Sequence, residues 1–255
     1  MKIALFSDIH ANIEALNEVL QDIDSKKPDA IYCLGDLVGY APFPNEVVET
    51  IRSRGIPVIA GNYDQGVGLG SDDCGCAYKT EEDQKRGVDS ITFTNQTVSA
   101  ENRSYLRSLP AHLRIEFGVN ENPWNMLLVH GSPRKINEYL FEDRADKSIL
   151  RMMEKADTHL MAFGHTHIPY HKKIRDQAGN IRHAINIGSV GKPKDGNPDA
   201  CYVILEWEGD LDLTREEALD VSFVRVPYDV EKAARAVEKS PLPNPFADML
   251  RNGGQ

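Results

Sequence analysis

Short apolar runs alternate with longer amphipathic stretches over the first sixty residues of the chain. Lys2–Phe6 has the length and apolar character of a buried strand, and Asn12–Asp24 has apolar residues at helical spacing. The alternation continues with a strand over Asp29–Leu34, a helix over Asn45–Arg54 and a strand over Ile56–Ala60. This order predicts a parallel sheet, because strands that are joined by helices usually run in the same direction.

The stretch 66–112 is more polar than the sequence on either side of it. Residues 66–75 are rich in glycine and aspartate, which is typical of a loop. Polar helices are predicted over Thr80–Asn95 and Ala100–Leu109, and Pro110 ends the second of them. We expect this stretch to be a helical insertion over one edge of the sheet or a small cap above a site.

The second half of the chain changes to consecutive strands that are separated by turn residues. The predicted strands are Leu113–Phe117, Met126–Val129, His159–Phe163, Tyr170–Arg175, Ile181–Ile187, Cys201–Glu206, Asp212–Glu216 and Ser222–Pro227. Helices are predicted over Arg144–Lys155 and Asp229–Lys239, with a last short helix in the proline-rich tail. A parallel half followed by an antiparallel half predicts an α/β fold with two packed sheets, in one domain over 1–255.

Composition and charge narrow the classes of function. The chain has 255 residues, of which 41% are hydrophobic, and its net charge is −10. Such an acidic protein lacks the positive field of a general nucleic-acid binder, so strong nucleic-acid binding is not expected. No apolar run is long enough to span a membrane, and Ser7 and Asp8 end the first run too early for a signal peptide. We expect a cytoplasmic protein.

The four cysteines add little chemistry of their own. Cys33 and Cys201 stand in apolar runs and are expected to be buried thiols. Cys74 and Cys76 form a single pair in the glycine-rich loop, and one pair alone gives weak support for a zinc site. The pattern fits a protein whose cysteines stay reduced.

Five predicted strands are followed by residues of the types that bind metal ions. These residues are Asp8, His10, Asp36, Asn62, His130, His165 and His167. The carboxyl ends of parallel strands line one crevice, so we expect these side chains to converge. Each residue taken alone is explained by a turn or by a solvated histidine. The ordinary preference of polar residues for turns does not explain five such strand ends, three of which have a glycine before the polar residue.

Seven side chains are too many for one tetrahedral zinc ion. They fit two metal ions that share one bridging carboxylate, an arrangement that serves phosphoryl transfer by holding both the attacking and the leaving oxygen. A mixture of histidine, aspartate and asparagine suits manganese, iron or zinc better than calcium.

These residues also occur in the order of a known family. The motifs Asp8-Ile9-His10, Gly35-Asp36, Gly61-Asn62-Tyr63-Asp64, His130 and Gly164-His165-Thr166-His167 resemble those of the calcineurin-like metallophosphoesterase superfamily. The resemblance covers about residues 1–207 and is greatest to the small bacterial and archaeal phosphodiesterase-like members. It implies an αββα sandwich in which two sheets are packed between helices.

The resemblance also implies roles for individual residues. Asp8, His10 and His167 would hold one metal ion, Asn62, His130 and His165 the other, and Asp36 would bridge them. A hydroxide that bridges the metals would attack phosphorus in line. The catalytic residues it implies are Asp36, Asn62, Asp64 and His130.

Position 63 departs from the family pattern. Many members have a histidine there, which contacts the phosphate or protonates the leaving oxygen, supported by the acid that follows. Tyr63 has an ordinary pKa near 10, which is poorly matched to proton transfer at neutral pH. We therefore expect Tyr63 to bind substrate and the preferred leaving groups to need little protonation, as in nucleotides, pyrophosphates and aryl phosphodiesters.

Residues outside the motifs give weaker signals. Arg134 is a candidate for binding a substrate phosphate, and a solvated surface arginine explains it equally well. The stretch 188–191 is interpreted as a turn, and Lys192 and Lys194 are expected to lie on a solvated face.

The main functional hypothesis is a dinuclear metal-dependent phosphoesterase that acts on phosphodiester or phosphoanhydride bonds of small nucleotide-like substrates. One alternative is a protein Ser/Thr phosphatase or general phosphomonoesterase, which Tyr63 argues against. Another is a non-catalytic scaffold that binds other proteins. Such a scaffold is expected to lose metal ligands, whereas this chain keeps all seven. An oligomer is compatible with the sequence.

Overall fold

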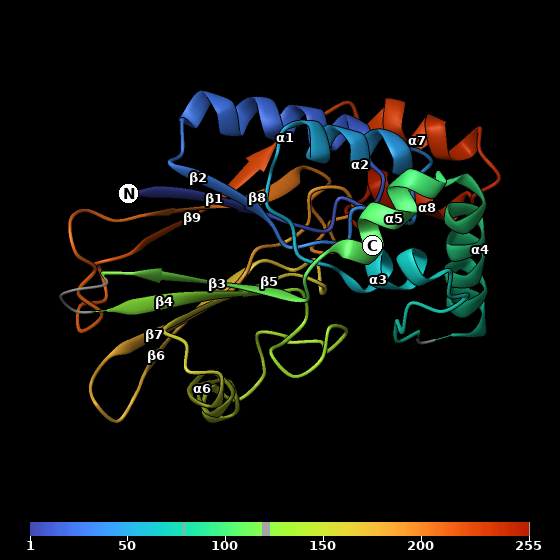
Figure 1. The fold of residues 1–255 in the computed structure, drawn as a ribbon. Coiled ribbons are helices and arrows are strands. Elements are labelled where there is room, and N and C mark those ends of the chain that lie inside the picture. The colour runs from blue at the N-terminus through green and yellow to red at the C-terminus, as the bar shows by residue number, and fades with distance from the viewer. Residues whose placement is uncertain (79, 119–122, 255) are drawn as a thin grey trace.

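Two β-sheets lie face to face in the computed structural model, which describes residues 1–78, 80–118 and 123–254 (Figure 1). The first sheet has the strand order β2 (Ala30–Cys33), β1 (Lys2–Phe6), β8 (Ala200–Glu206) and β9 (Asp220–Val226). The second has the order β3 (His112–Phe117), β4 (Trp124–Val129), β5 (Leu160–Phe163), β7 (Ile181–Asn186) and β6 (Tyr170–Arg175).

Helices cover the outer faces of both sheets (Figure 1). Helices α1 (Ile13–Lys26), α2 (Pro44–Ser53) and α7 (Val230–Glu238) lie on the side of the first sheet, and α6 (Asp146–Lys155) lies against the second. This αββα order confirms the expected two-sheet sandwich. Helices α3 (Asn62–Leu69), α4 (Glu81–Thr97), α5 (Ala100–Ser108) and α8 (Pro245–Arg251) gather beyond one end of the sheets. None of the helices in the described ranges combines the length and the apolar character that a membrane crossing requires.

The apolar run of β1 is explained by burial on both of its faces. Ile3 and Leu5 point into the core between the two sheets, whereas Ala4 and Phe6 pack with residues of α1 and α2. All four side chains have no exposed surface. Burying a side chain of the size of leucine or phenylalanine stabilises the fold by about 1.5–3 kcal/mol, so this strand is firmly anchored.

Parallel and antiparallel pairing are mixed within each sheet rather than divided between the halves of the chain. Strands β1 and β2 are parallel, but β8 returns to pair with β1 in the antiparallel direction. In the second sheet, β5 pairs in parallel with both β4 and β7. The predicted parallel pairing of the early strands is therefore confirmed, whereas the prediction of an antiparallel second half is wrong in part, because β5 pairs in parallel on both sides.

Two strand predictions are wrong. The segment 56–60 forms only an isolated parallel bridge between Val58 and Cys33, since Pro57 has no amide hydrogen to extend the ladder. The segment 212–216 is a turn, because the Asp212 carboxylate accepts hydrogen bonds from both the amide and the hydroxyl of Thr214.

The loop predicted from residue 66 begins instead as a helix. Helix α3 runs through Gly66 and Gly68 to Leu69. A Cβ atom at Gly68 would lie 2.8 Å from the backbone nitrogen of Arg107, so the missing side chain lets α3 approach α5 closely. The glycines that indicated a loop thus serve helix packing.

Candidate metal centre

The seven side chains expected to converge do lie together, at the end of the sheets where β1, β2, β4 and β5 stop and α3 begins. Each is at most 3% exposed. Two groups have ligand atoms within 4.8 Å of one another, and each group could hold a metal ion. The first consists of Asp8, His10 and His167, and the second of Asp36, His130 and His165.

The carboxylate of Asp36, a member of the second group, also approaches the first group. Its Oδ2 is 3.6 Å from Nε2 of His10 and 3.3 Å from Nε2 of His130. Asn62 adjoins the second group, with its Oδ1 3.1 Å from Nε2 of His130. Its Nδ2 donates to the carbonyl of Cys74, which orients the amide oxygen toward the cluster.

Backbone carbonyls orient three of the histidines. Nδ1 of His10 is 3.0 Å from the Val38 oxygen, and Nδ1 of His130 is 2.8 Å from the Leu34 oxygen. Nδ1 of His167 likewise lies 2.5 Å from a backbone oxygen, that of Lys192. Because a carbonyl only accepts, Nδ1 carries the hydrogen and the Nε2 lone pair is available to a metal ion.

Several polar atoms in the cluster lack partners in the protein. Oδ1 of Asp8 and Nε2 of His165 are buried and have no hydrogen-bond partner among the described residues. A buried atom left in this way costs about 1–3 kcal/mol. Nε2 of His10 and Nε2 of His167 are only 3.1 Å apart. One cation in each group would satisfy these four atoms between them, so the residues present fit a metal centre.

The backbone of the cluster is strained. Five of its residues have a positive φ, which is costly for residues other than glycine. These are Asp8 (54°), His10 (49°), Asp36 (52°), His165 (67°) and His167 (62°). Each left-handed residue costs about 1–3 kcal/mol and persists only when its surroundings enforce it. Strain concentrated on these residues indicates a functional role.

Two glycines allow the backbone to approach the carboxylates, as expected from the sequence. A Cβ atom at Gly61 would lie 2.1 Å from Oδ1 of Asp36, and one at Gly164 would lie 2.3 Å from Oδ2 of Asp8. The same oxygens accept hydrogen bonds from the amides of Tyr63 (2.8 Å) and His165 (3.1 Å). One oxygen of each carboxylate is thus fixed by the backbone, and the other faces the cluster.

Burial and neighbouring charges set the protonation of the histidines. Burial, together with the nearby His130, lowers the pKa of His165 to about 2. Burial also lowers the pKa of His10 and His167, so these three rings are neutral near pH 7. Burial opposes a charge on His130 too, but the Asp36 carboxylate outweighs it and raises the pKa of that ring. In the metal-free protein a proton on His130 therefore supplies positive charge that metal ions would replace.

Asp64, predicted to be catalytic, lies behind the cluster. It is fully buried, and its oxygens accept hydrogen bonds from the amides of Leu37 (2.9 Å) and Gly61 (3.0 Å). These bonds join the loop that carries Asp36 to the start of the helix that carries Asn62. Asp64 is thus placed as a positioning residue.

Tyr63 is 1% exposed and packs against aromatic rings. Its ring centroid is 5.4 Å from that of His10 and 4.8 Å from that of Tyr40. Its hydroxyl has no hydrogen-bond partner within the described ranges. Burial, with a contribution from Tyr40, raises the pKa of Tyr63 well above 10. At neutral pH this phenol keeps its proton.

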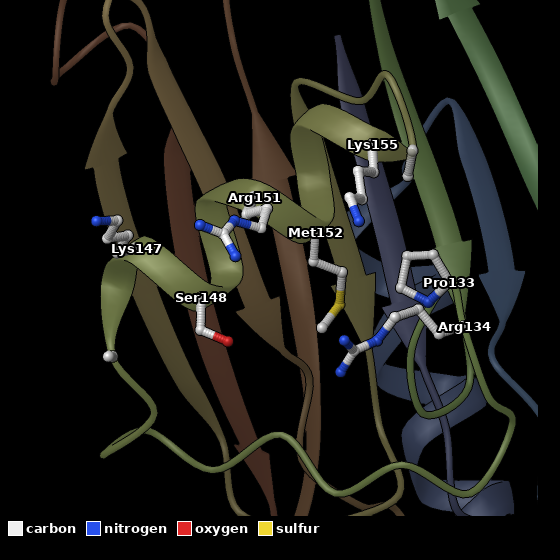
Figure 2. Close-up of a pocket in the computed structure, with 9 residues that line it drawn as sticks. Pro133, Arg134, Lys147, Ser148, Arg151, Met152 and Lys155 are labelled. Atoms are coloured by element: carbon white, nitrogen blue, oxygen red, sulfur yellow. The ribbon is translucent and has the colours of Figure 1, made fainter.

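Arg134 lies outside the cluster. It lines a groove of about 510 Å³ beside α6. Figure 2 shows Arg134 there together with Lys147, Arg151 and Lys155. None of the seven clustered side chains lines this groove. Arg134 also lines a neighbouring hollow with His130, but its guanidinium is held by the carboxylate of Glu138.

Sequence reasoning missed Lys192, whose expected place on a solvated face is wrong. Lys192 is 6% exposed, and its Nζ lies 4.6 Å from the centroid of the Tyr40 ring. The preceding loop brings it there, because the Ser189 hydroxyl and the Gly191 amide both donate to the backbone oxygen of Asp8. The signal in the sequence was a glycine-rich turn directly after a strand, followed by two lysines.

Comparisons with known proteins find similar sequences and similar folds. A model of the calcineurin-like phosphoesterase superfamily domain matches residues 1–210. The chain is 35% identical to an uncharacterised protein of Methanocaldococcus jannaschii, over 97% of this chain and 96% of that protein. A metallophosphoesterase from Sphaerobacter thermophilus is 30% identical, with 99% of each chain covered and a TM-score of 0.74. A hypothetical protein from Pyrococcus horikoshii shares the fold at 23% identity, with a TM-score of 0.78 over 100% of this chain and 99% of that one.

Proposed function

Because this chain belongs to the calcineurin-like phosphoesterase superfamily, we propose that it is a dinuclear metal-dependent phosphoesterase. Its substrates are small nucleotide-like molecules, in which it hydrolyses phosphodiester or phosphoanhydride bonds. The observation that carries the proposal is that Asp36, a member of one buried ligand group, also approaches the other. A carboxylate there can bridge two ions, which a single-ion site does not require.

The ligand roles follow from the contacts. Asp8, His10 and His167 would hold one ion, Asn62, His130 and His165 the second, and Asp36 would contact both. Manganese, iron or zinc suit these donors. When bound, such ions lower the pKa of a water nucleophile and neutralise charge on the phosphoryl oxygens.

The tyrosine at position 63 favours substrates with good leaving groups. Burial, with a contribution from Tyr40, raises the pKa of Tyr63. Its phenol is therefore poorly matched to donate a proton at neutral pH. Phosphodiesters and anhydrides with acidic leaving groups need such a donor least. This argues against the general phosphomonoesterase and the protein phosphatase.

A non-catalytic scaffold would not need this site. It would have no use for five strained residues, or for a buried carboxylate oxygen of Asp8 that has no hydrogen-bond partner among the described residues. The intact ligand set therefore favours an enzyme.

Hydrolysis of bis(p-nitrophenyl) phosphate with added Mn²⁺, Fe²⁺ or Zn²⁺ tests this function. We expect turnover that needs metal and falls more than about 100-fold in Asp36→Asn and His165→Ala, since each variant removes a ligand from a metal that stabilises the transition state. Asp248→Asn is the matched control, because that side chain is 71% exposed on α8. No turnover with any of these metals, or full turnover in Asp36→Asn, would contradict the proposal.

A further inference from the structure

A hollow of about 310 Å³ lies beside the metal centre and is built from distant parts of the chain. Its lining includes Tyr40, Tyr78 and Arg86 from the N-terminal half, Tyr139, and Lys192 and Lys194 from the loop after β7. Its volume is at the lower end of the range for small-molecule sites, which is about 300–1,000 Å³.

Three contacts join this hollow to the histidines of the cluster. The ring centroid of Tyr139 is 4.2 Å from that of His165, and the centroid of Tyr40 is 4.8 Å from that of His10. Lys192 contacts the third histidine, because its backbone oxygen accepts from Nδ1 of His167. A molecule in the hollow would therefore lie next to the candidate metal positions.

Two lysines of the hollow have no carboxylate partner among the described residues. Lys192 is 6% exposed and Lys194 is partly buried, and within the described ranges neither ammonium forms an ion pair. Nζ of Lys192 instead lies over the ring of Tyr40. Removing a cation from water is costly unless a negative charge compensates it, so an anion in the hollow would stabilise both lysines in their charged form.

The other charged groups of the hollow do not provide that anion. Asp83 also lines it, but its carboxylate accepts from the hydroxyl of Thr80 (2.8 Å) and contacts Arg86 (3.4 Å). Arg86 is held in addition by Glu82. Both carboxylates are thus engaged by Arg86, and within the described ranges neither forms an ion pair with Lys192 or Lys194.

The hydrogen-bond donors of the hollow are the lysine ammonium groups. Each ammonium offers several donors, whereas the carboxylate of Asp83, which also lines the hollow, is already engaged. Phosphate oxygens accept hydrogen bonds of this kind, and bonds to a charged acceptor are about twice as strong as neutral ones.

We propose that this hollow binds the second phosphate of a phosphoanhydride substrate, whose neighbouring phosphate lies at the metal centre. This inference rests on the proposed function and narrows it. The substrate class is a nucleoside or dinucleoside polyphosphate, and Lys192 and Lys194 determine the preference for it over a substrate with a single phosphate. The rings of Tyr40 and Tyr139 form apolar walls on the side of the histidines.

The test compares two ligands that differ only in the second phosphate group. Dissociation constants of AMP and of the non-hydrolysable α,β-methylene ADP are measured by calorimetry at fixed free Mn²⁺. We expect the wild-type protein to bind the diphosphate analogue at least about 10-fold more tightly, because it alone reaches the lysines. In the double variant Lys192→Gln/Lys194→Gln, the preference for the diphosphate analogue over AMP should fall below about 3-fold. Lys194→Gln alone, which changes a partly exposed side chain, should lie between these values.

Lys147→Gln/Arg151→Gln is the matched control, because it removes two positive charges from α6 outside the hollow. It should keep the wild-type preference. Equal affinity for the two ligands in the wild-type protein, or an unchanged preference in both lysine variants, would overturn the inference. Hydrolysis of bis(p-nitrophenyl) phosphate is measured in parallel. A protein that shows the preference but no hydrolysis would refute the proposed function and leave the anion site standing.

Discussion

At the scale of single side chains, the surroundings of Tyr63 are the most informative about the chemistry of the site. It follows the ligand candidate Asn62 and precedes the positioning residue Asp64 at the start of α3. Its ring touches that of His10, and its hydroxyl is buried without a partner in the described part of the chain. The position is close enough to the cluster to affect catalysis, but the phenol does not give up its proton near pH 7.

A histidine at this position should supply the missing acid. We expect Tyr63→His to raise the turnover of an alkyl phosphodiester relative to bis(p-nitrophenyl) phosphate by at least about 10-fold, since general acid catalysis contributes about 10²–10⁴-fold. The measurement is the ratio of kcat/KM for the two substrates. Tyr63→Phe, which removes only the hydroxyl, should leave this ratio unchanged. The same ratio in Tyr63→His and wild type would show that position 63 does not limit leaving-group choice.

Individual residues also show what the sequence can and cannot predict. The convergence of Asp8, Asp36 and His130 was predictable, because each follows a strand and strand ends share an edge. The burial of Lys192 was not, since it depends on Ser189 and Gly191 binding the backbone of Asp8, far away in the sequence. Contacts at such separation leave no local pattern.

Strands and helices differ in how well their patterns predicted them. Strand β1 is apolar on both faces, and its bounds of Lys2–Phe6 match the prediction. Helix α3 was missed, because glycine disfavours helices locally while the packing of Gly68 against α5 favours one here. The turn at Asp212 was mistaken for a strand, because the Asp212 carboxylate accepts hydrogen bonds from Thr214 and these bonds fix the backbone in a turn conformation.

Strands β6 and β7 contain a pair of histidines that should make stability depend on pH. Nε2 of His171 is 2.9 Å from Nδ1 of His183. Burial, with help from Lys173, lowers the pKa of His171 to about 4. Burial, with help from His171, lowers the pKa of His183 to about 3. The unfolded chain takes up these protons below about pH 6.5, before the folded protein does.

The stability that depends on the neutral pair is therefore present above pH 6.5 and is lost as the pH falls toward 4. We expect the free energy of unfolding to fall by on the order of 5 kcal/mol over this range because of the pair. Urea unfolding of metal-free protein measures it. In His171→Gln/His183→Gln the decrease should be smaller by that amount, although other histidines still contribute. Parallel pH profiles for the two proteins would show that the pair does not titrate in this way.

The whole molecule brings together residues that are as much as 159 positions apart, Asp8 and His167, by stacking two sheets whose strand ends meet. The stretch 66–112, predicted as an insertion or cap, contributes Tyr78 and Arg86 to the hollow beside the cluster. The chain has a net charge of −10, so positive charge is confined to local sites. Metal ions and the two lysines would provide it where an anionic substrate binds.

The central claim is that two metal ions, bridged by Asp36, are both needed for hydrolysis. The most direct measurement is a titration of metal-free protein with Mn²⁺, in which bound metal per chain and hydrolysis of bis(p-nitrophenyl) phosphate are followed together. We expect two ions to bind per chain and activity to appear with the second, because each ligand group holds one ion and the reaction uses both. Full activity with a single bound ion per chain would contradict the proposed two-metal reaction. A protein that binds no ion at all would contradict it as well.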